Sequence, residues 1–244
     1  MPIIRLPTDE ESELRGFRGP EAQRRRAVLR ETLQAFERCQ PRDRYHRLAA
    51  ANLERWRREA REHSTPAVLV LPGDWGEVAL TLTKRFGTCF AVLNMANAHF
   101  PGGAYGEGAV HIDTASPRVC IRGAEDRSRA DLGYAWLPDT EVFPFLELRA
   151  AAQDLGDGAP FDAADARRRI AAVLDTLHTH AIRHAVLGAL GCGAFRNPSA
   201  EVARLFREEI ARRAGAFDVL AFAIYAAGYG PDNHAVFRTA FDRE

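Results

Sequence analysis

Lysine is almost missing from this chain. Lys84 is the only lysine among 33 Lys and Arg residues, which are balanced by 33 Asp and Glu residues. The formal net charge of zero gives no reason to expect nucleic acid or an anionic membrane as the main partner. The preference for arginine is typical of a biased genome, although arginine is also the better bidentate ligand for phosphate.

Cysteine is scarce as well. The four cysteines are Cys39, Cys89, Cys120 and Cys192, and none stands at CxxC or Cys/His ligand spacing. This spacing argues against a zinc site and against a disulfide framework, so we expect no metal and a reduced, cytoplasmic protein. Nothing in the sequence implies a cofactor.

The chain also lacks long apolar runs. No stretch approaches the length of a membrane span, and the opening MPIIRLPTDEESELRG is polar and acidic, unlike a signal peptide. We therefore expect neither secretion nor membrane insertion. With 46% hydrophobic residues in 244 positions, the chain can still bury a full core. We predict a flexible lead over residues 1–19 and a single domain over 20–244, which includes N-terminal helices at 20–62.

Apolar residues recur at helical spacing near the N-terminus. Leu29, Leu33 and Phe36 mark the inner face of a helix that starts at Pro20, and a second helix is expected over 44–62. Further helices are predicted over 77–85, over 163–183 and from Ser199 onward.

Continuous apolar runs, typical of strands buried on both faces, alternate with these helices. They read AVLVLP, CFAVLNM, HAVLGAL and DVLAFAIY. EVFPF is interpreted as an edge strand, because Pro144 cannot donate to a ladder. The alternation predicts the α/β class, as a three-layer α/β/α sandwich with a mixed, mostly parallel sheet.

Two glycine-rich turns follow apolar runs. The first lies in NMANAHFPGGAYGEGAVHIDT, from Asn94 to Thr114, and the second is GCGAFRNP, before a helix for which Ser199 is the expected N-cap. Successive amides in such turns form an anion site, and ligands of open α/β sheets bind past the carboxyl ends of the strands. A phosphorylated or nucleotide-like ligand is therefore our first hypothesis, although a plain structural turn would explain either segment alone.

Several separated segments together resemble one family. RETLQAFE, VLNMANAHFPGGAYGEGA, PDTEVF, VLGALGCGAFRNPSAEVARLFRE and FDVLAFAIY stand in the order found in macrodomains of the microbial poly(ADP-ribose) glycohydrolase type. The resemblance spans roughly residues 27–242. It implies a macrodomain-like α/β/α fold that binds ADP-ribose, with the diphosphate between the two glycine-rich loops.

The resemblance also assigns roles to single positions. Asn97 matches the asparagine that holds the distal ribose, Phe195 matches an aromatic residue packed over the ligand, and Tyr225 is placed on the adenine side. Cys192 would equally serve as a small filler, and Phe195 as a core residue. Loop contacts with the ligand are expected from Gly102, Gly103, Ala104 and Tyr105, and from Gly191, Cys192, Gly193, Ala194 and Phe195. Ile112 and Thr114 are expected to contact the ligand as well.

One part of the family pattern is missing. The family carries Gln-Glu-Glu shortly after its glycines, and the second Glu is the acid/base; here that triplet reads Ile112, Asp113 and Thr114. A one-residue slip in the loop would place Asp113 on the second Glu. Asp113 is the carboxylate expected to stabilise the anomeric carbon or to activate water, and Glu107 is the second candidate.

The sequence therefore predicts an ADP-ribosyl hydrolase that cleaves the glycosidic bond of the distal ribose. Loss of the double Glu favours mono-ADP-ribosylated protein, including arginine-linked protein, over polymer. The expected partner is ADP-ribose or an ADP-ribosylated protein, without direct nucleic-acid binding. Two alternatives stay open: a reader module that binds ADP-ribose without catalysis, and a different nucleotide enzyme built on the same cradle.

Overall fold

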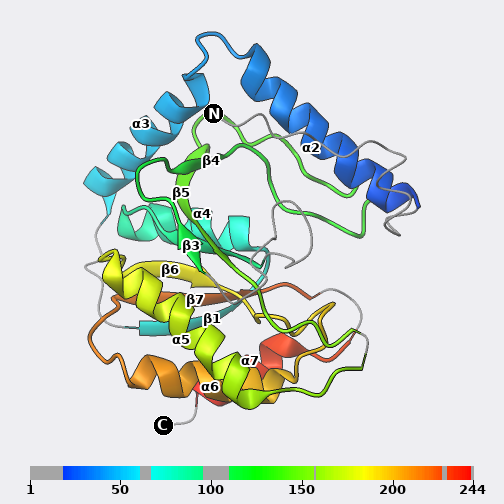
Figure 1. Cartoon of the computed structure of the whole chain (residues 1–244). Coiled ribbons are helices and arrows are strands. Elements are labelled where there is room, and N and C mark those ends of the chain that lie inside the picture. Colours follow the sequence, from blue (N-terminus) through cyan, green and yellow to red (C-terminus); the bar gives the residue numbers. More distant parts are fainter. Residues whose placement is uncertain (1–18, 61–66, 96–109, 157, 227–229, 243–244) are drawn as a thin grey trace.

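A mostly parallel sheet forms the centre of the molecule (Figure 1). The computed structural model describes residues 19–60, 67–95, 110–156, 158–226 and 230–242. The sheet strands of this part are β1 (Ala67–Pro72), β2 (Ala91–Met95), β3 (His111–Ile112), β4 (Arg118–Cys120), β5 (Phe143–Ala150), β6 (His184–Leu187) and β7 (Val219–Ile224).

The strand order is β1-β7-β6-β2-β5-β3, with β4 also paired to β5. Neighbours from β1 to β5 run parallel, whereas β3 and β4 run antiparallel to β5. The central runs of apolar residues are buried on both faces, which is why they read as continuous hydrophobic stretches. The predicted mixed, mostly parallel sheet is confirmed.

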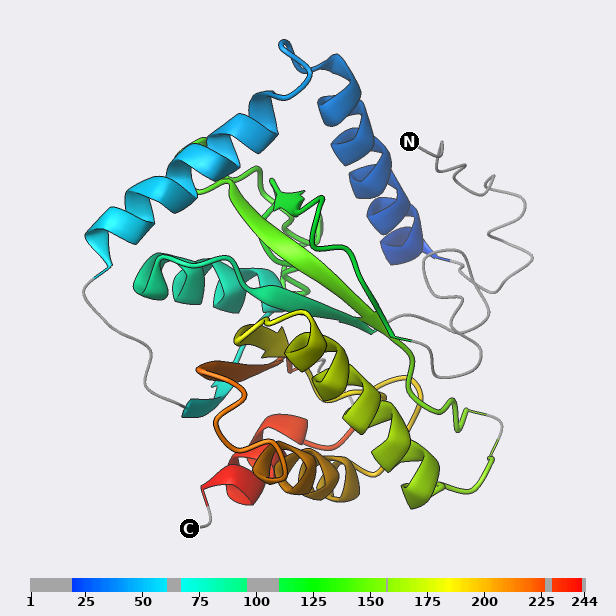
Figure 2. The ribbon, with the colours of Figure 1, turned by 60° about the vertical axis from the view of Figure 1, so that its left-hand side comes forward.

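Helices cover both faces of the sheet, as Figures 1 and 2 show. The described helices are α2 (Pro20–Arg38), α3 (Arg44–Glu59), α4 (Trp75–Phe86), α5 (Ala163–Thr179), α6 (Ser199–Ala211) and α7 (Asn233–Phe241). One core joins the sheet to α5, α6 and α7 through buried residues such as Ile170, Leu205 and Phe237. The other joins it to α3 and α4 through Trp56 and Leu82. The three-layer prediction is thereby confirmed.

Helix α2 lies apart from these layers, beside the segment 121–137 that follows β4 (Figures 1 and 2). Its start at Pro20 agrees with the prediction, and Phe36 packs against a buried cluster as expected, but Leu29 does not belong to the inner face. Leu29 is 47% exposed, and Val28 is the buried residue instead. Polar contacts cause this rotation, because Thr32 and Glu31 of α2 both bind Arg122 of the neighbouring segment.

Two other sequence expectations are corrected. The helix predicted over 163–183 ends at Thr179, since Ala181 takes a left-handed φ of 54° and the buried Ile182 follows outside the helix. EVFPF is not an edge strand, because β5 lies between β2 and the antiparallel pair β3 and β4. Pro144 is tolerated because it precedes Leu146, where the ladder with β2 begins.

Some expectations lie largely outside the described residues. The predicted lead over 1–19 is described only at its last residue. Among the described helices, none is both long and apolar enough to cross a lipid bilayer. All four cysteines are described, and all are free thiols.

Candidate ligand-binding site

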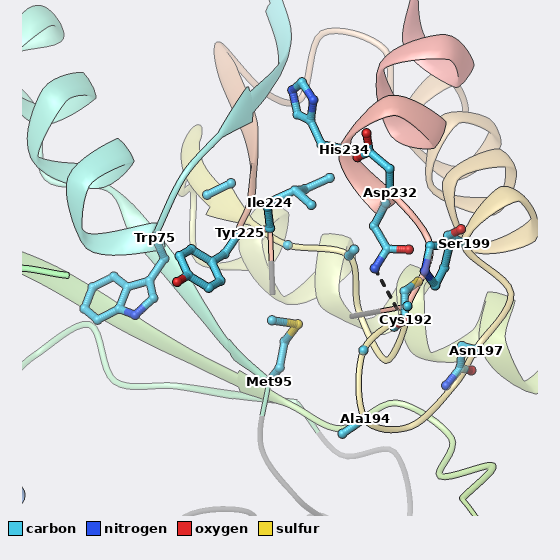
Figure 3. A pocket seen from close by; sticks show the side chains of 18 of the residues that line it. Trp75, Met95, Cys192, Ala194, Asn197, Ser199, Ile224, Tyr225, Asp232 and His234 are labelled. Carbon is cyan, nitrogen blue, oxygen red and sulfur yellow. Dashed lines mark hydrogen bonds between the residues drawn. The ribbon is translucent and has the colours of Figure 1, made fainter. Parts of the chain in front are cut away.

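A cavity of about 1220 Å³ opens at the carboxyl ends of β1, β2, β6 and β7 (Figure 3). Residues at the last position of these strands or directly after it line the cavity, among them Gly73, Met95, Gly188 and Tyr225. Parallel strands end at a common edge of the sheet, and the chain leaves that edge in loops, so a cavity forms there without any special insertion.

One wall of the cavity is the loop 191–197. Gly191 adopts a φ of 75°, and a Cβ on it would lie 2.4 Å from the Cβ of Ala152 and 2.6 Å from Nδ2 of Asn197. The buried Asn197 closes the loop, because its Nδ2 donates to the carbonyl oxygens of Gln153 at 2.7 Å and Gly191 at 3.1 Å. These contacts fix the loop by backbone geometry and one amide side chain.

The same loop presents a series of amides. Its internal hydrogen bonds use the backbone N–H groups of Cys192, Arg196 and Asn197. Within the described ranges, no acceptor is bonded to the intervening amides at 193–195. Successive N–H groups of this kind form a concavity that suits an anion.

Helix α6 begins at the end of this loop. Its N-cap is Pro198, which makes no side-chain cap, and Ser199 and Ala200 line the cavity. The helix starts at Ser199 as predicted, but the expectation that Ser199 is the N-cap is wrong, because Ser199 is already the first helical residue. The first-turn amides and the positive end of the helix dipole therefore face the cavity.

The other two helices that begin at the cavity carry their own caps. Asp74 accepts a hydrogen bond from the amide of Gly76 at 2.7 Å at the start of α4, and Asp232 accepts one from the amide of Ala235 at 3.0 Å at the start of α7. Burial raises the pKa of Asp74. These two carboxylates line the cavity but are committed to helix termini.

A second wall comes from the segment 121–137, an irregular hairpin closed by backbone bonds between Gly123 and Ala135 and between Tyr134 and Ala124. It brings Glu125 and Arg127 to the cavity. Nothing in the apolar pattern of this segment marks it as part of a site. Its only sequence signal is a density of charged residues, which is equally typical of a solvated loop.

Glu125 lies at the centre of a charged cluster. Its Oε1 accepts hydrogen bonds from Nη2 of Arg25 at 2.5 Å and Nε of Arg127 at 2.9 Å, and its Oε2 accepts one from the Tyr134 hydroxyl at 2.5 Å. The hydrogen bond from Arg25 is the main reason why the pKa of Glu125 falls to about 2. Glu125 is therefore an anion under ordinary conditions, fully occupied by its neighbours.

Exposed apolar and aromatic side chains make up much of the remaining lining (Figure 3). Trp75, Met95 and Tyr225 are all exposed although they are large and hydrophobic. The Trp75 ring packs on Phe145 at 5.1 Å between centroids, and the guanidinium of Arg127 lies 5.6 Å from the centre of the Tyr225 ring. Flat apolar surface next to charged groups suits a ligand with a planar base and polar appendages.

Helix α7 contributes two buried polar atoms at the cavity. Asn233 donates from Nδ2 to the carbonyl oxygen of Cys192 at 3.4 Å, which joins α7 to the loop 191–197. Its Oδ1 and Nε2 of His234 are buried and have no hydrogen-bond partner among the described residues. Both residues line the cavity, so their polar atoms are available to a ligand or to water.

Solved structures with the same fold are known. No protein-family model matches the chain, and no curated protein matches its sequence. The poly(ADP-ribose) glycohydrolase of Thermomonospora curvata matches with a TM-score of 0.62 and 23% identity, over 89% of this chain and 99% of that chain. Its structure with the inhibitor ADP-HPD has the same values. The Deinococcus radiodurans glycohydrolase in complex with ADP-ribose matches with a TM-score of 0.55 and 23% identity, over 80% and 91% of the two chains.

This chain has the fold of the bacterial poly(ADP-ribose) glycohydrolases. The fold implied by the sequence resemblance is thus confirmed. At 23% identity the likeness concerns the arrangement of helices and strands. The roles of single residues are therefore argued from the geometry of the cavity.

Several predicted ligand contacts come together at the cavity of the glycohydrolase fold. Cys192, Gly193, Ala194 and Tyr225 line it, and Gly191 shapes the loop behind them. Burial raises the pKa of Cys192 to about 12, so its thiol stays neutral and acts as a small filler. Phe195 is half-buried and is not part of the lining.

Asp113 lies elsewhere in the described part of the glycohydrolase fold. Its Oδ1 accepts hydrogen bonds from the amides of Ala115 at 3.0 Å and Ser116 at 3.1 Å, which forms a tight turn, and it does not line the cavity. The topology explains this place: β3 runs antiparallel to β5, so the chain after Ile112 moves away from the carboxyl edge of the parallel strands. Ile112 is buried in the core and Thr114 is exposed.

The first glycine-rich loop lies outside the described residues. This concerns Asn97, Gly102, Gly103, Ala104, Tyr105 and Glu107, whose roles stay predictions. In the described ranges, no group of His, Cys, Asp or Glu side chains is arranged to hold a metal ion.

Proposed function

We propose that this protein hydrolyses an ADP-ribosyl bond and releases ADP-ribose. The observation that supports this most is the cavity at the carboxyl edge, bounded by the loop 191–197 and the α6 N-terminus, in a fold shared with glycohydrolases. One of those structures holds ADP-ribose and another holds the inhibitor ADP-HPD.

The cavity offers a place for each part of such a ligand. The amides at 193–195 and the first turn of α6 would bind the diphosphate, because both present N–H groups and partial positive charge. The exposed ring of Tyr225 would carry the adenine. Asn97 and the loop 102–105 would hold the distal ribose.

For the chemistry we assign Asp113 as the first candidate and Glu107 as the second. A carboxylate near the anomeric carbon stabilises the positive character that develops there as the bond to the carrier breaks. It accepts a proton from the water that attacks this carbon, and a proton passes to the departing carrier atom, so that free ADP-ribose and the unmodified carrier result. The two turn-forming hydrogen bonds of Asp113 use Oδ1, so Oδ2 is the oxygen that we assign to water. Because Asp113 and Thr114 stand at the spacing of the double Glu, we propose mono-ADP-ribosylated protein, including arginine-linked protein, as the preferred substrate over polymer.

A second candidate function is a reader that binds ADP-ribose without cleaving it. The specific observation in its favour is the position of Asp113, which forms a turn and is not among the residues that line the cavity. Among the described residues, the carboxylates that line the cavity are Asp74, Glu125 and Asp232, and each is engaged in structural hydrogen bonds.

The test is release of ADP-ribose from arginine-linked mono-ADP-ribosylated protein and from polymer, together with calorimetric binding of ADP-ribose. We expect Asp113→Asn to keep the turn, since an amide oxygen still accepts from the amides, and to keep ADP-ribose affinity while abolishing release. Asp154→Asn is the matched control, because Asp154 forms a similar exposed turn with Gly156 at 2.9 Å.

The outcomes separate the candidates. Binding without release from any substrate by the wild-type protein would establish the reader. Unchanged release by Asp113→Asn together with loss in Glu107→Gln would move the chemistry to Glu107. Absence of ADP-ribose binding would overturn both candidate functions.

A further inference from the structure

Helix α2 is joined to the cavity by a chain of charged side chains. Arg25 of α2 binds Glu125 in a two-point contact, with Nη2 to Oε1 at 2.5 Å and Nε to Oε2 at 3.2 Å. Two parallel hydrogen bonds of this kind fix the orientation of both groups, which a single contact does not. The pair connects residues 100 positions apart in the sequence.

Glu125, held in this way by Arg25, in turn orients Arg127 through a hydrogen bond. The Oε1 atom that accepts from Arg25 also accepts from Nε of Arg127, at 2.9 Å. Only 17% of the Glu125 side chain is exposed, and the Tyr134 hydroxyl holds its other oxygen. Glu125 therefore has little freedom to bind a ligand itself, but it is well placed to set the direction of the Arg127 guanidinium.

Arg127 stands at the cavity against an aromatic ring. It lines the cavity together with Glu125 and Tyr225, and its guanidinium carbon lies 5.6 Å from the centre of the Tyr225 ring. Because Nε is turned toward Glu125, the two Nη groups at the other end of the planar guanidinium point away from that carboxylate. Arg25 and Arg127 both bind Glu125, and Arg25 also binds Glu21 of its own helix, so Arg127 is the basic group of this cluster that lines the cavity.

We propose that α2 is part of the ligand-binding site: Arg25 positions Glu125, Glu125 orients Arg127, and Arg127 donates hydrogen bonds to a phosphate of the bound nucleotide. This inference rests on the proposed function for the class of ligand. A guanidinium held by a carboxylate is pre-organised, so a phosphate that meets it loses little affinity to side-chain ordering. The phosphate site then has a backbone part, at 193–195, and a cationic part, at Arg127.

Calorimetric titration of ADP-ribose at several salt concentrations tests the role of Arg127. We expect Arg127→Ala to weaken binding about tenfold, as befits loss of a charge-assisted hydrogen bond. The dependence of affinity on salt should become shallower, because one cation less faces the phosphates. Arg127→Lys should retain part of the affinity for ADP-ribose and part of its dependence on salt. A weaker affinity with an unchanged salt dependence would mean that Arg127 acts only through Tyr225, and would overturn the phosphate assignment.

A double-mutant cycle tests the positioning role of Arg25. Arg25→Ala should weaken binding several-fold, and the double variant with Arg127→Ala should bind no more weakly than Arg127→Ala alone. Arg25→Lys should restore part of the loss. Arg24→Ala is the matched control on the same helix, because Arg24 binds Glu31 and the carbonyl oxygen of Asp131 instead of Glu125.

Thermal melting of every variant separates positioning from folding. Loss of affinity in Arg24→Ala equal to that in Arg25→Ala, or fully additive effects in the cycle, would overturn the role of α2. If the wild-type protein binds ADP-ribose and the Arg25 and Arg127 variants bind it equally well, this inference fails while the proposed function stands. If the wild-type protein binds no ADP-ribose, the proposed function fails and this inference falls with it.

Discussion

The two walls of the cavity are built in different ways. The wall at 191–197 is fixed by a positive-φ glycine and by hydrogen bonds to carbonyl oxygens, all within a short stretch of chain or its immediate neighbours. The wall at 121–137 is fixed by charged side chains, and its central contact joins Arg25 to Glu125 across the molecule. The first wall depends on backbone space, whereas the second depends on charge, and so the two should respond to different perturbations.

Gly191→Ala should have the largest destabilising effect on the wall at 191–197. Its new Cβ would lie within 2.6 Å of Asn197 at a φ of 75°, so we expect a loss of about 3 kcal/mol or more in the free energy of unfolding. Urea denaturation measures it. Gly193→Ala is the control, because a Cβ there meets nothing within 4 Å. Equal stability of the two variants would contradict this account of the wall.

Asn197→Ala should have the next largest effect. The buried amide donates to the carbonyl oxygens of Gln153 and Gly191, and its loss leaves them without this partner, which costs about 2–3 kcal/mol in the free energy of unfolding. Asn94→Ala is the matched comparison, because Asn94 makes an exposed hydrogen bond to Glu147. The same denaturation series compares them. A loss for Asn94→Ala as large as that for Asn197→Ala would show that burial does not decide the cost.

The stability of the wall at 121–137 should depend on pH. The pKa of Glu125 in the folded protein is about 2, below its ordinary value of 4.5, so the unfolded chain takes up a proton first as the pH falls. The stabilisation is therefore complete above about pH 4.5 and is lost progressively toward pH 2. Because Arg25 is partly exposed, we expect Glu125→Gln to cost only about 1–2 kcal/mol at neutral pH.

Comparison of wild type and Glu125→Gln by denaturation at several pH values measures this term. The difference in the free energy of unfolding between the two proteins should shrink as the pH falls through this window. The Gly191→Ala difference should stay constant over the same range, because no titrating group is involved. A pH-independent difference for Glu125→Gln would mean that the ion pairs do not hold this wall.

Asp232→Ala has the smallest expected effect on the free energy of unfolding, and it tests whether the N-terminus of α7 belongs to the cavity. Loss of this N-cap should lower the free energy of unfolding by about 1 kcal/mol. Asp162→Ala removes the corresponding cap of α5, away from the lining residues, and should cost a similar amount. Only Asp232→Ala should also change ADP-ribose affinity in calorimetry. Equal affinities of the two variants would separate the α7 N-terminus from the site.

The sequence predicted the parallel strands β2, β6 and β7 well, because each contains a short apolar run that is buried. The short antiparallel strands β3 and β4 were not predicted. The sequence also misjudged Pro144 and Leu29, whose surroundings depend on partners that periodicity does not contain. Pro144 can lie in an interior strand because the ladder between β5 and β2 starts two residues later, at Leu146. Leu29 faces outward because Arg122 binds Glu31 and Thr32 on the adjoining side of α2.

The same division holds for the site. The loop 191–197 could be found from the sequence, since glycines after an apolar run are a local signal, and Tyr225 was named through the family resemblance. Glu125 and Arg127 could not be found, because their surroundings are completed by Arg25, far away in the chain. Asp113 was predicted as the reacting carboxylate, and the structure adds that its Oδ1 forms a tight turn after β3.

The amino-acid sequence was enough to predict the order of the elements, the parallel core and the edge of the sheet at which the cavity opens. It could do so because side-chain burial and the conformational demands of glycine act over a few residues. The buried face of α2, the interior position of β5 and the contact of α2 with the cavity wall through Glu125 became visible only in the folded chain. Those outcomes depend on pairing between distant segments, and the energy of an ion pair or a strand ladder exists only once both partners are in place.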